Sequence, residues 1–90
     1  MRALRRDDNE DVLLETAYCL GMHFEPCGPL DGWILYRRIW LPVEIKNPKG
    51  RNRYTPRQLK FIERCKNAGV SVHTWRTEQD VIHSANTWGN

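Results

Sequence analysis

Two acidic residues and one lysine have the types and the spacing that could do chemistry. Asp31 stands at the head of one apolar run, and Glu44 and Lys46 close the next. If strand pairing brings them together, two carboxylates face each other, and opposed carboxylates repel. A sheet has little reason to keep such a pair unless a cation lies between them, either the lysine or a divalent metal. Hard cations such as Mg²⁺ and Mn²⁺ prefer oxygen ligands, so the second case would give metal-assisted chemistry.

A hairpin would position these groups. The apolar runs Ile34–Tyr36 and Ile39–Leu41 flank the arginine pair 37–38, a pattern that predicts an antiparallel hairpin turning at the arginines. Carrying the register outward from this turn places Asp31 opposite Glu44. Side chains alternate along each strand, so one face of the hairpin should be continuously apolar. The other face then carries Asp31, Trp33, Trp40, Pro42, Glu44 and Lys46.

A third carboxylate is singled out by its place in the first expected helix. That helix is capped by Asp7 or Asp8 and runs to about Leu20. Glu10 points from it toward the body of the protein, and a carboxylate there is unfavourable unless it is paired or metal-bound. The apolar residues that share its face are Leu13, Leu14 and Ala17.

The next expected helix begins with a capping pattern that includes a glutamine. Thr55 with Pro56 behind it is a strong helix start, and Gln58 completes a T-x-x-Q capping box. The helix runs to about Ala68, with Gly69 as its stop. The side chains expected to point inward from it are Leu59, Ile62 and Cys65 or Phe61.

Asp31, followed after twelve residues by Glu44-Ile45-Lys46, resembles the motif of the PD-(D/E)XK nucleases. The Tyr54–Gln58 segment on the next helix is similar to the small VRR-Nuc type found as stand-alone phage proteins. The resemblance covers Arg6 to about Val81, and it implies a DNA endonuclease that depends on Mg²⁺ or Mn²⁺. A preference for branched or Holliday-junction DNA is part of what it implies. The implied catalytic residues are Asp31, Glu44, Lys46 and Gln58, and the implied metal ligands are Glu10, Asp31, Glu44 and the carbonyl of Ile45.

The rest of the chain completes an α/β domain that spans residues 1–90. Met22–Cys27 reads as a short strand, and Val70–Trp75 as a later one, with Val70 and Val72 packed and Trp75 a further candidate for the core. Thr77 caps a last helix that runs through about Ala85. The order α-β-β-β-α-β-α predicts a restriction-endonuclease-like mixed sheet flanked by helices.

Charge and composition indicate which kind of partner the protein binds. Net charge is +3, but the segment from Lys46 to Lys66 holds eight basic residues against one acid. A basic block beside an acidic pocket suits a polyanion held near a metal, so DNA is the expected partner. The residues expected to contact its phosphates are Lys49, Arg51, Arg53, Arg57 and Lys60.

Three cysteines without C-x-x-C spacing argue against a disulfide framework and a zinc knuckle, and buried or partly buried thiols in a reducing cytosol are expected. No apolar stretch is long enough to span a membrane. We therefore expect a cytoplasmic protein, in the host cytoplasm if it is phage-encoded. No small-molecule cofactor is expected besides the metal.

Two other functions remain open. A module of the same fold could bind nucleic acid without cutting it. The Asp31, Glu44 and Lys46 set could also be a structural salt bridge in an assembly or inhibitor protein. Trp33 and Trp40 lie on the face of the hairpin that carries the carboxylates, and their apolar rings need to pack against another surface. A two-fold partner would supply one, so we expect a homodimer, and the alternative is a monomer whose own helices cover the tryptophans.

Overall fold

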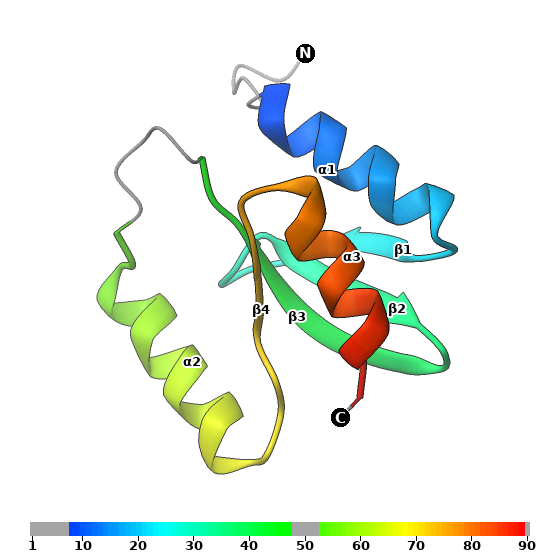
Figure 1. Ribbon diagram of the computed structural model, residues 1–90. Coiled ribbons are helices and arrows are strands. Elements are labelled where there is room, and N and C mark those ends of the chain that lie inside the picture. Colours follow the sequence, from blue (N-terminus) through cyan, green and yellow to red (C-terminus); the bar gives the residue numbers. More distant parts are fainter. Residues whose placement is uncertain (1–7, 48–52, 90) are drawn as a thin grey trace.

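The hairpin predicted at the arginine pair forms the centre of a four-stranded mixed sheet (Figure 1). The computed structural model describes residues 8–47 and 53–89. The predicted order α-β-β-β-α-β-α is confirmed. The elements are α1 (Asp8–Cys19), β1 (His23–Pro26), β2 (Gly32–Tyr36), β3 (Ile39–Ile45), α2 (Pro56–Asn67), β4 (His73–Trp75) and α3 (Glu78–Thr87).

The hairpin register agrees with the prediction. Tyr36 pairs with Ile39, and the pairing continues outward to Gly32 with Val43, so that Asp31 and Glu44 follow as the next opposed positions. Arg37 and Arg38 have φ values of 52° and 69°. Positive φ at both central residues is the signature of a type I′ turn, whose twist matches that of the flanking strands. The sequence therefore makes a tight turn here without the usual glycine or asparagine.

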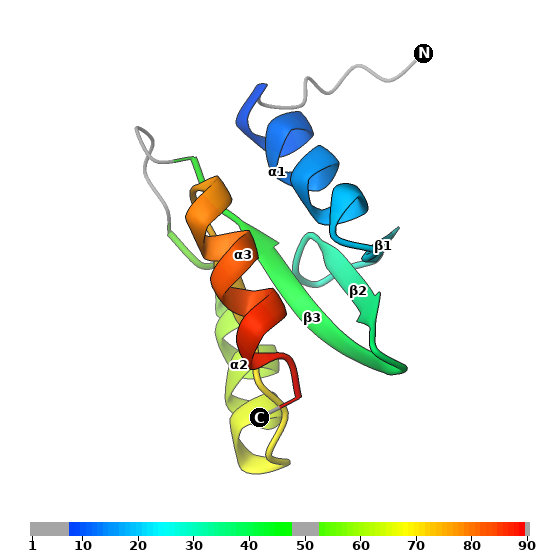
Figure 2. The same ribbon diagram turned by 45° about the vertical axis from the view of Figure 1, so that its right-hand side comes forward.

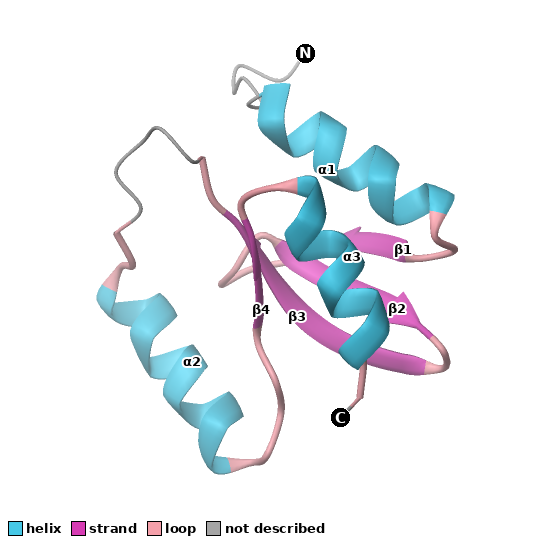
Figure 3. Ribbon diagram, in the orientation of Figure 1, coloured by secondary structure: helices cyan, strands magenta, loops and turns pink. Residues whose placement is uncertain are grey.

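Strand order in the sheet is β1-β2-β3-β4, and β4 runs parallel to β3 (Figure 3). A strand over Val70–Trp75 was predicted, but β4 spans His73–Trp75. The backbone N–H of Val70 donates to the carbonyl of Cys65 at 2.7 Å, and Ala68 and Gly69 also bond back into the last turn of α2. These residues complete the end of the helix, which delays the start of the strand.

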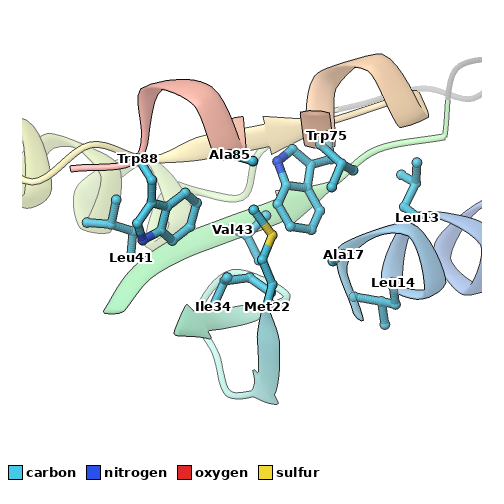
Figure 4. Packing of buried hydrophobic residues seen from close by; sticks show 11 residues of the cluster. Leu13, Leu14, Ala17, Met22, Ile34, Leu41, Val43, Trp75, Ala85 and Trp88 are labelled. Carbon is cyan, nitrogen blue, oxygen red and sulfur yellow. The ribbon is translucent and has the colours of Figure 1, made fainter. Parts of the chain in front are cut away.

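Helices cover both faces of the sheet (Figure 2). α1 and α3 pack side by side on the face that carries Ile34, and α2 lies on the opposite face. The core lies under α1 and α3, as Figure 4 shows. Its buried members are Leu13, Leu14, Ala17, Met22, Ile34, Leu41, Val43, Trp75, Val81, Ala85 and Trp88.

The opposite face is held by a smaller contact. Phe61 of α2 meets Trp33 of β2 edge to face, with ring centroids 6.2 Å apart. Leu59 was predicted to point inward, but it is 54% exposed. The covered face of α2 instead carries Gln58, Phe61, Ile62 and Cys65, at helical spacing, and Leu59 lies about 100° around the helix from the first of them.

Candidate active site

Asp31 and Glu44 meet at the end of the hairpin, and each side chain bonds the backbone of the opposite strand. The N–H of Asp31 donates to Oε1 of Glu44 at 3.1 Å. The N–H of Ile45 donates to Oδ2 of Asp31 at 2.6 Å. Because these two bonds are reciprocal, both carboxylates are fixed by backbone groups rather than left to rotate.

Lys46 joins the pair from the next residue on the same face. Its Nζ lies 3.2 Å from Oε2 of Glu44 and 4.0 Å from the centroid of the Tyr54 ring. Its backbone N–H donates to the carbonyl of Trp75 at 2.9 Å, so β4 holds the chain at this point. Glu44 and Lys46 are 6% and 5% exposed. The predicted convergence of two carboxylates and an ammonium is therefore confirmed, within a buried setting.

Burial raises the pKa of Glu44 above its ordinary value of 4.5, and the neighbouring carboxylate of Asp31 raises it further. Lys46 acts in the opposite direction, because its hydrogen bond and its positive charge lower the pKa of Glu44. Two carboxylates share one ammonium here, so the ionised set carries an excess negative charge. Such a site gains from taking up either a proton or a further cation.

The donor set fits a hard divalent metal ion. Asp31 and Glu44 offer carboxylate oxygens, and the carbonyl of Ile45 is directed toward the Asp31 side, because the N–H and C=O of one strand residue point to the same neighbour. Mg²⁺ commonly binds through one or two carboxylates and completes its shell with waters and substrate phosphate. Within residues 8–47 and 53–89, no group of three His, Cys, Asp or Glu side chains is placed to hold a metal ion. The reciprocal backbone bonds bring Asp31 and Glu44 together as a pair.

The predicted face of α1 is confirmed, since Leu13, Leu14 and Ala17 are buried and Glu10 on the same side is half-buried. Its neighbour Asn9 was missed by the sequence reasoning. The Asn9 side chain donates from Nδ2 to the carbonyl of Lys46 at 2.9 Å. This bond brings the first turn of α1 to the carboxylate pair. That Glu10 is a ligand stays a prediction.

The capping alternative for Gln58 is confirmed. Its N–H donates to Oγ1 of Thr55 at 3.1 Å, and its Oε1 accepts from the N–H of Thr55 at 3.0 Å. The amide nitrogen Nε2 also donates to the carbonyl of Pro29 at 3.1 Å. Gln58 thus ties the start of α2 to the loop that leads into Asp31. A direct role in positioning water or phosphate stays a prediction.

A basic cleft lies beside this loop. Arg57, Lys60 and Arg64 share one side of α2 and line a pocket of about 390 Å³. All three are exposed, and no ion pair joins them to a carboxylate in the described part of the chain. Arg53 is exposed as well, whereas the predicted contacts Lys49 and Arg51 lie outside the described residues. The remaining walls of the pocket are Pro29, Pro56 and Phe61.

A second polar cluster lies under α3. Ser84 is buried, and its Oγ is 2.8 Å from both Nε1 of Trp75 and Nδ1 of His73. The indole can only donate, so Ser84 Oγ accepts from Trp75, and the tautomer of the His73 ring sets the direction of the bond between Ser84 Oγ and His73 Nδ1. Burial lowers the pKa of His73, and the charge of His83 lowers it further. This network holds β4 against α3, which supports the structural role expected for His73.

Comparison with protein-family models, with curated proteins and with solved structures gives no match to this chain. Among the described residues, no helix is both long and apolar enough to cross a membrane. All three cysteines are free. Cys65 is buried, whereas Cys19 and Cys27 are exposed, so the expectation of buried or partly buried thiols is confirmed for Cys65 and wrong for the other two.

Proposed function

We propose that this protein is a DNA endonuclease of the PD-(D/E)XK type that hydrolyses phosphodiester bonds with Mg²⁺ or Mn²⁺. The observation that carries the proposal is the convergence of half-buried Asp31 with buried Glu44 and Lys46, in a set with more negative than positive charge. A protein that only binds a polyanion gains nothing from two clustered carboxylates, since they repel phosphate. A metal ion would reverse the sign of the site.

Asp31, Glu44 and the carbonyl of Ile45 would hold the metal ion. When bound, it would lower the pKa of a water ligand and offset charge on the phosphate. Lys46 would donate hydrogen bonds that orient the attacking water and would stabilise the extra negative charge on the oxygens of the pentavalent phosphate. The attacking water would lose a proton to solvent, its oxygen would bond to phosphorus as the bond to one sugar oxygen breaks, and the departing oxygen would gain a proton from solvent. Arg57, Lys60 and Arg53 would hold neighbouring phosphates.

A non-catalytic DNA-binding module is the second candidate, and one observation favours it. Lys46 is already engaged, because its ammonium pairs with Glu44 and lies over the Tyr54 ring. If the protein only binds DNA, Asp31, Glu44 and Lys46 would form a structural ion pair beside the basic cleft. Measuring the binding of a divalent metal ion separates the two candidates. The nuclease is expected to bind one at this site, whereas a structural ion pair is not.

We also propose that the protein is cytoplasmic and forms a homodimer. The support for a dimer comes from other residues than the tryptophans that the sequence suggested. Trp33 is half-buried against Phe61 of its own chain, so its cover needs no partner. Exposed apolar side chains elsewhere offer a surface. Val12 and Ile82, 45% and 38% exposed, lie one turn from Thr16 and Glu78, whose side chains are hydrogen-bonded between α1 and α3. Sedimentation of wild type and Ile82→Lys would test it, and a wild-type mass near 10.7 kDa would contradict it.

The proposed activity is tested by incubating the purified protein with labelled duplex, flap, nicked and four-way-junction DNA, with and without Mn²⁺. We expect cleavage that requires the metal, strongest on branched substrates. Binding to these substrates without cleavage under any metal condition would instead support the binding module.

A further inference from the structure

An apolar groove of about 540 Å³ lies between β3 and the C-terminal half of α2. β4 pairs with the Val43–Ile45 part of β3, so the Ile39–Leu41 part, which pairs with β2 along its other edge, borders this groove instead of β4. Its walls include two aromatic rings and aliphatic groups, with one cation among them. They are formed in part by Trp33, Ile39, Trp40, Arg64, Cys65 and Val70.

The two tryptophans differ in how they are held. Trp33 is braced edge to face by Phe61 and is half-buried, so its position is fixed by its own chain. Trp40 is 47% exposed. An indole ring with so much open area beside a fixed aromatic wall is a surface on which a flat, aromatic ligand can stack.

Arg64 lines both this groove and the basic cleft. Arg57, Lys60 and Arg64 follow one side of α2 over about 10 Å of helix axis. The cleft begins at Pro29, two residues before Asp31, and the helix leads from there to the groove. A chain of phosphates along these three cations would therefore bring its attached bases to the tryptophans.

We propose that the groove holds an unpaired base of a DNA strand whose phosphates lie on Arg57, Lys60 and Arg64. This inference rests on the proposed function in taking DNA as the ligand, and it assigns a single-stranded segment to the substrate. Both faces of a base inside a duplex are covered by its neighbours, so a base that stacks on Trp40 must be unpaired or flipped out. Stacking is tolerant of sequence, because every base has an aromatic face.

A second copy of this chain is the other occupant that an apolar groove could take. The charges disfavour it, because two copies meeting here would bring their Arg64 side chains and basic clefts together. A polyanion is complementary to the same charges.

The test measures binding in EDTA by fluorescence anisotropy, so that cleavage plays no part. The ligands are a labelled oligothymidylate, an abasic strand of equal length and a blunt duplex. We expect wild type to bind the oligothymidylate at least about fivefold more tightly than the abasic strand, and Trp40→Ala to lose that preference. Trp40→Phe should retain most of it, and Tyr18→Ala, which removes an exposed ring on α1, should retain all of it.

Equal affinity of wild type for the oligothymidylate and the abasic strand would overturn the inference without any need for a variant. So would unchanged preference in Trp40→Ala. Conversion of a wild-type dimer to a monomer by Trp40→Ala would assign the groove to a second copy. Binding in EDTA and Mn²⁺-dependent cleavage are separate measurements, so the inference and the proposed nuclease activity can each fail alone.

Discussion

Replacing Asp31 with asparagine should stabilise the metal-free protein while removing its response to metal. Opposed side chains lie about 5 Å apart, and two unit charges at that distance repel by roughly 3 kcal/mol at an effective dielectric constant of about 20. Asparagine can still accept from the N–H of Ile45, although a neutral bond is weaker by about 1 kcal/mol. The net gain at neutral pH is therefore up to about 2 kcal/mol, or about 10 °C in melting temperature for a domain of this size.

The gain should depend on pH. Because folding raises the pKa of Glu44 above 4.5, protonated Glu44 stabilises the wild type at acid pH, and this contribution is lost as pH rises through the raised pKa. Asp31→Asn removes one cause of that rise, so its advantage should appear above this pKa. Below it, Glu44 is uncharged, the repulsion is absent, and the variant should be slightly less stable than wild type.

Thermal unfolding followed by circular dichroism, from pH 4 to 8 with and without millimolar Mn²⁺, measures both effects. Mn²⁺ should raise the melting temperature of the wild type, since a ligand that binds the folded state stabilises it. It should leave Asp31→Asn nearly unchanged. Asp11→Asn, an exposed carboxylate on α1, is the matched control and should behave as wild type. Destabilisation by Asp31→Asn at pH 7, or an equal Mn²⁺ response in both proteins, would refute the electrostatic reasoning.

Three further predictions concern other parts of the fold. The double variant Arg37→Asn, Arg38→Gly should raise the free energy of unfolding by about 1 kcal/mol, because both positions have positive φ. Chemical denaturation measures this change, and a loss of stability would contradict the type I′ turn. Ser84→Ala should lower the free energy of unfolding by about 2–4 kcal/mol, because Trp75 and His73 lose their hydrogen-bond partner. The control Thr87→Ala loses only an exposed bond to the carbonyl of His83 and should lower it by less than about 0.5 kcal/mol. A Ser84→Ala protein as stable as its control would exclude the network. Replacing Arg57 and Lys60 with alanine should lower the salt dependence of DNA affinity by about 0.7–0.9 per lost phosphate contact, with Arg76→Ala, an exposed arginine before α3, as control. An unchanged slope would mean that the cleft is an ordinary solvated surface.

The local features of the site could be predicted from the sequence. Alternation and a two-residue turn fix a hairpin register, so the opposition of Asp31 and Glu44 followed from counting. The capping box at Thr55 and Gln58 is a local pattern as well. The orientation of Glu10 followed from helical spacing.

Contacts between distant segments could not be predicted in this way. The bond from Asn9 to Lys46 and the position of Ser84 between Trp75 and His73 depend on how helices settle on the sheet. Helical spacing suggested Leu59 as an inward residue, but the placement of α2 selected the face of Phe61. Periodicity shows that a helix has an apolar face, and it does not show which edge of that face meets the sheet.

The central claim is that Asp31, Glu44 and Lys46 act as one hydrolytic unit. The direct measurement is the single-turnover rate of Mn²⁺-dependent cleavage of labelled four-way-junction DNA by wild type, Asp31→Asn, Glu44→Gln, Lys46→Met and the three double variants. We predict that each single variant loses at least about a hundredfold in rate and that the double variants lose little more, because removing one member already disables the unit. Cleavage by Glu44→Gln or Lys46→Met at the wild-type rate would contradict the account.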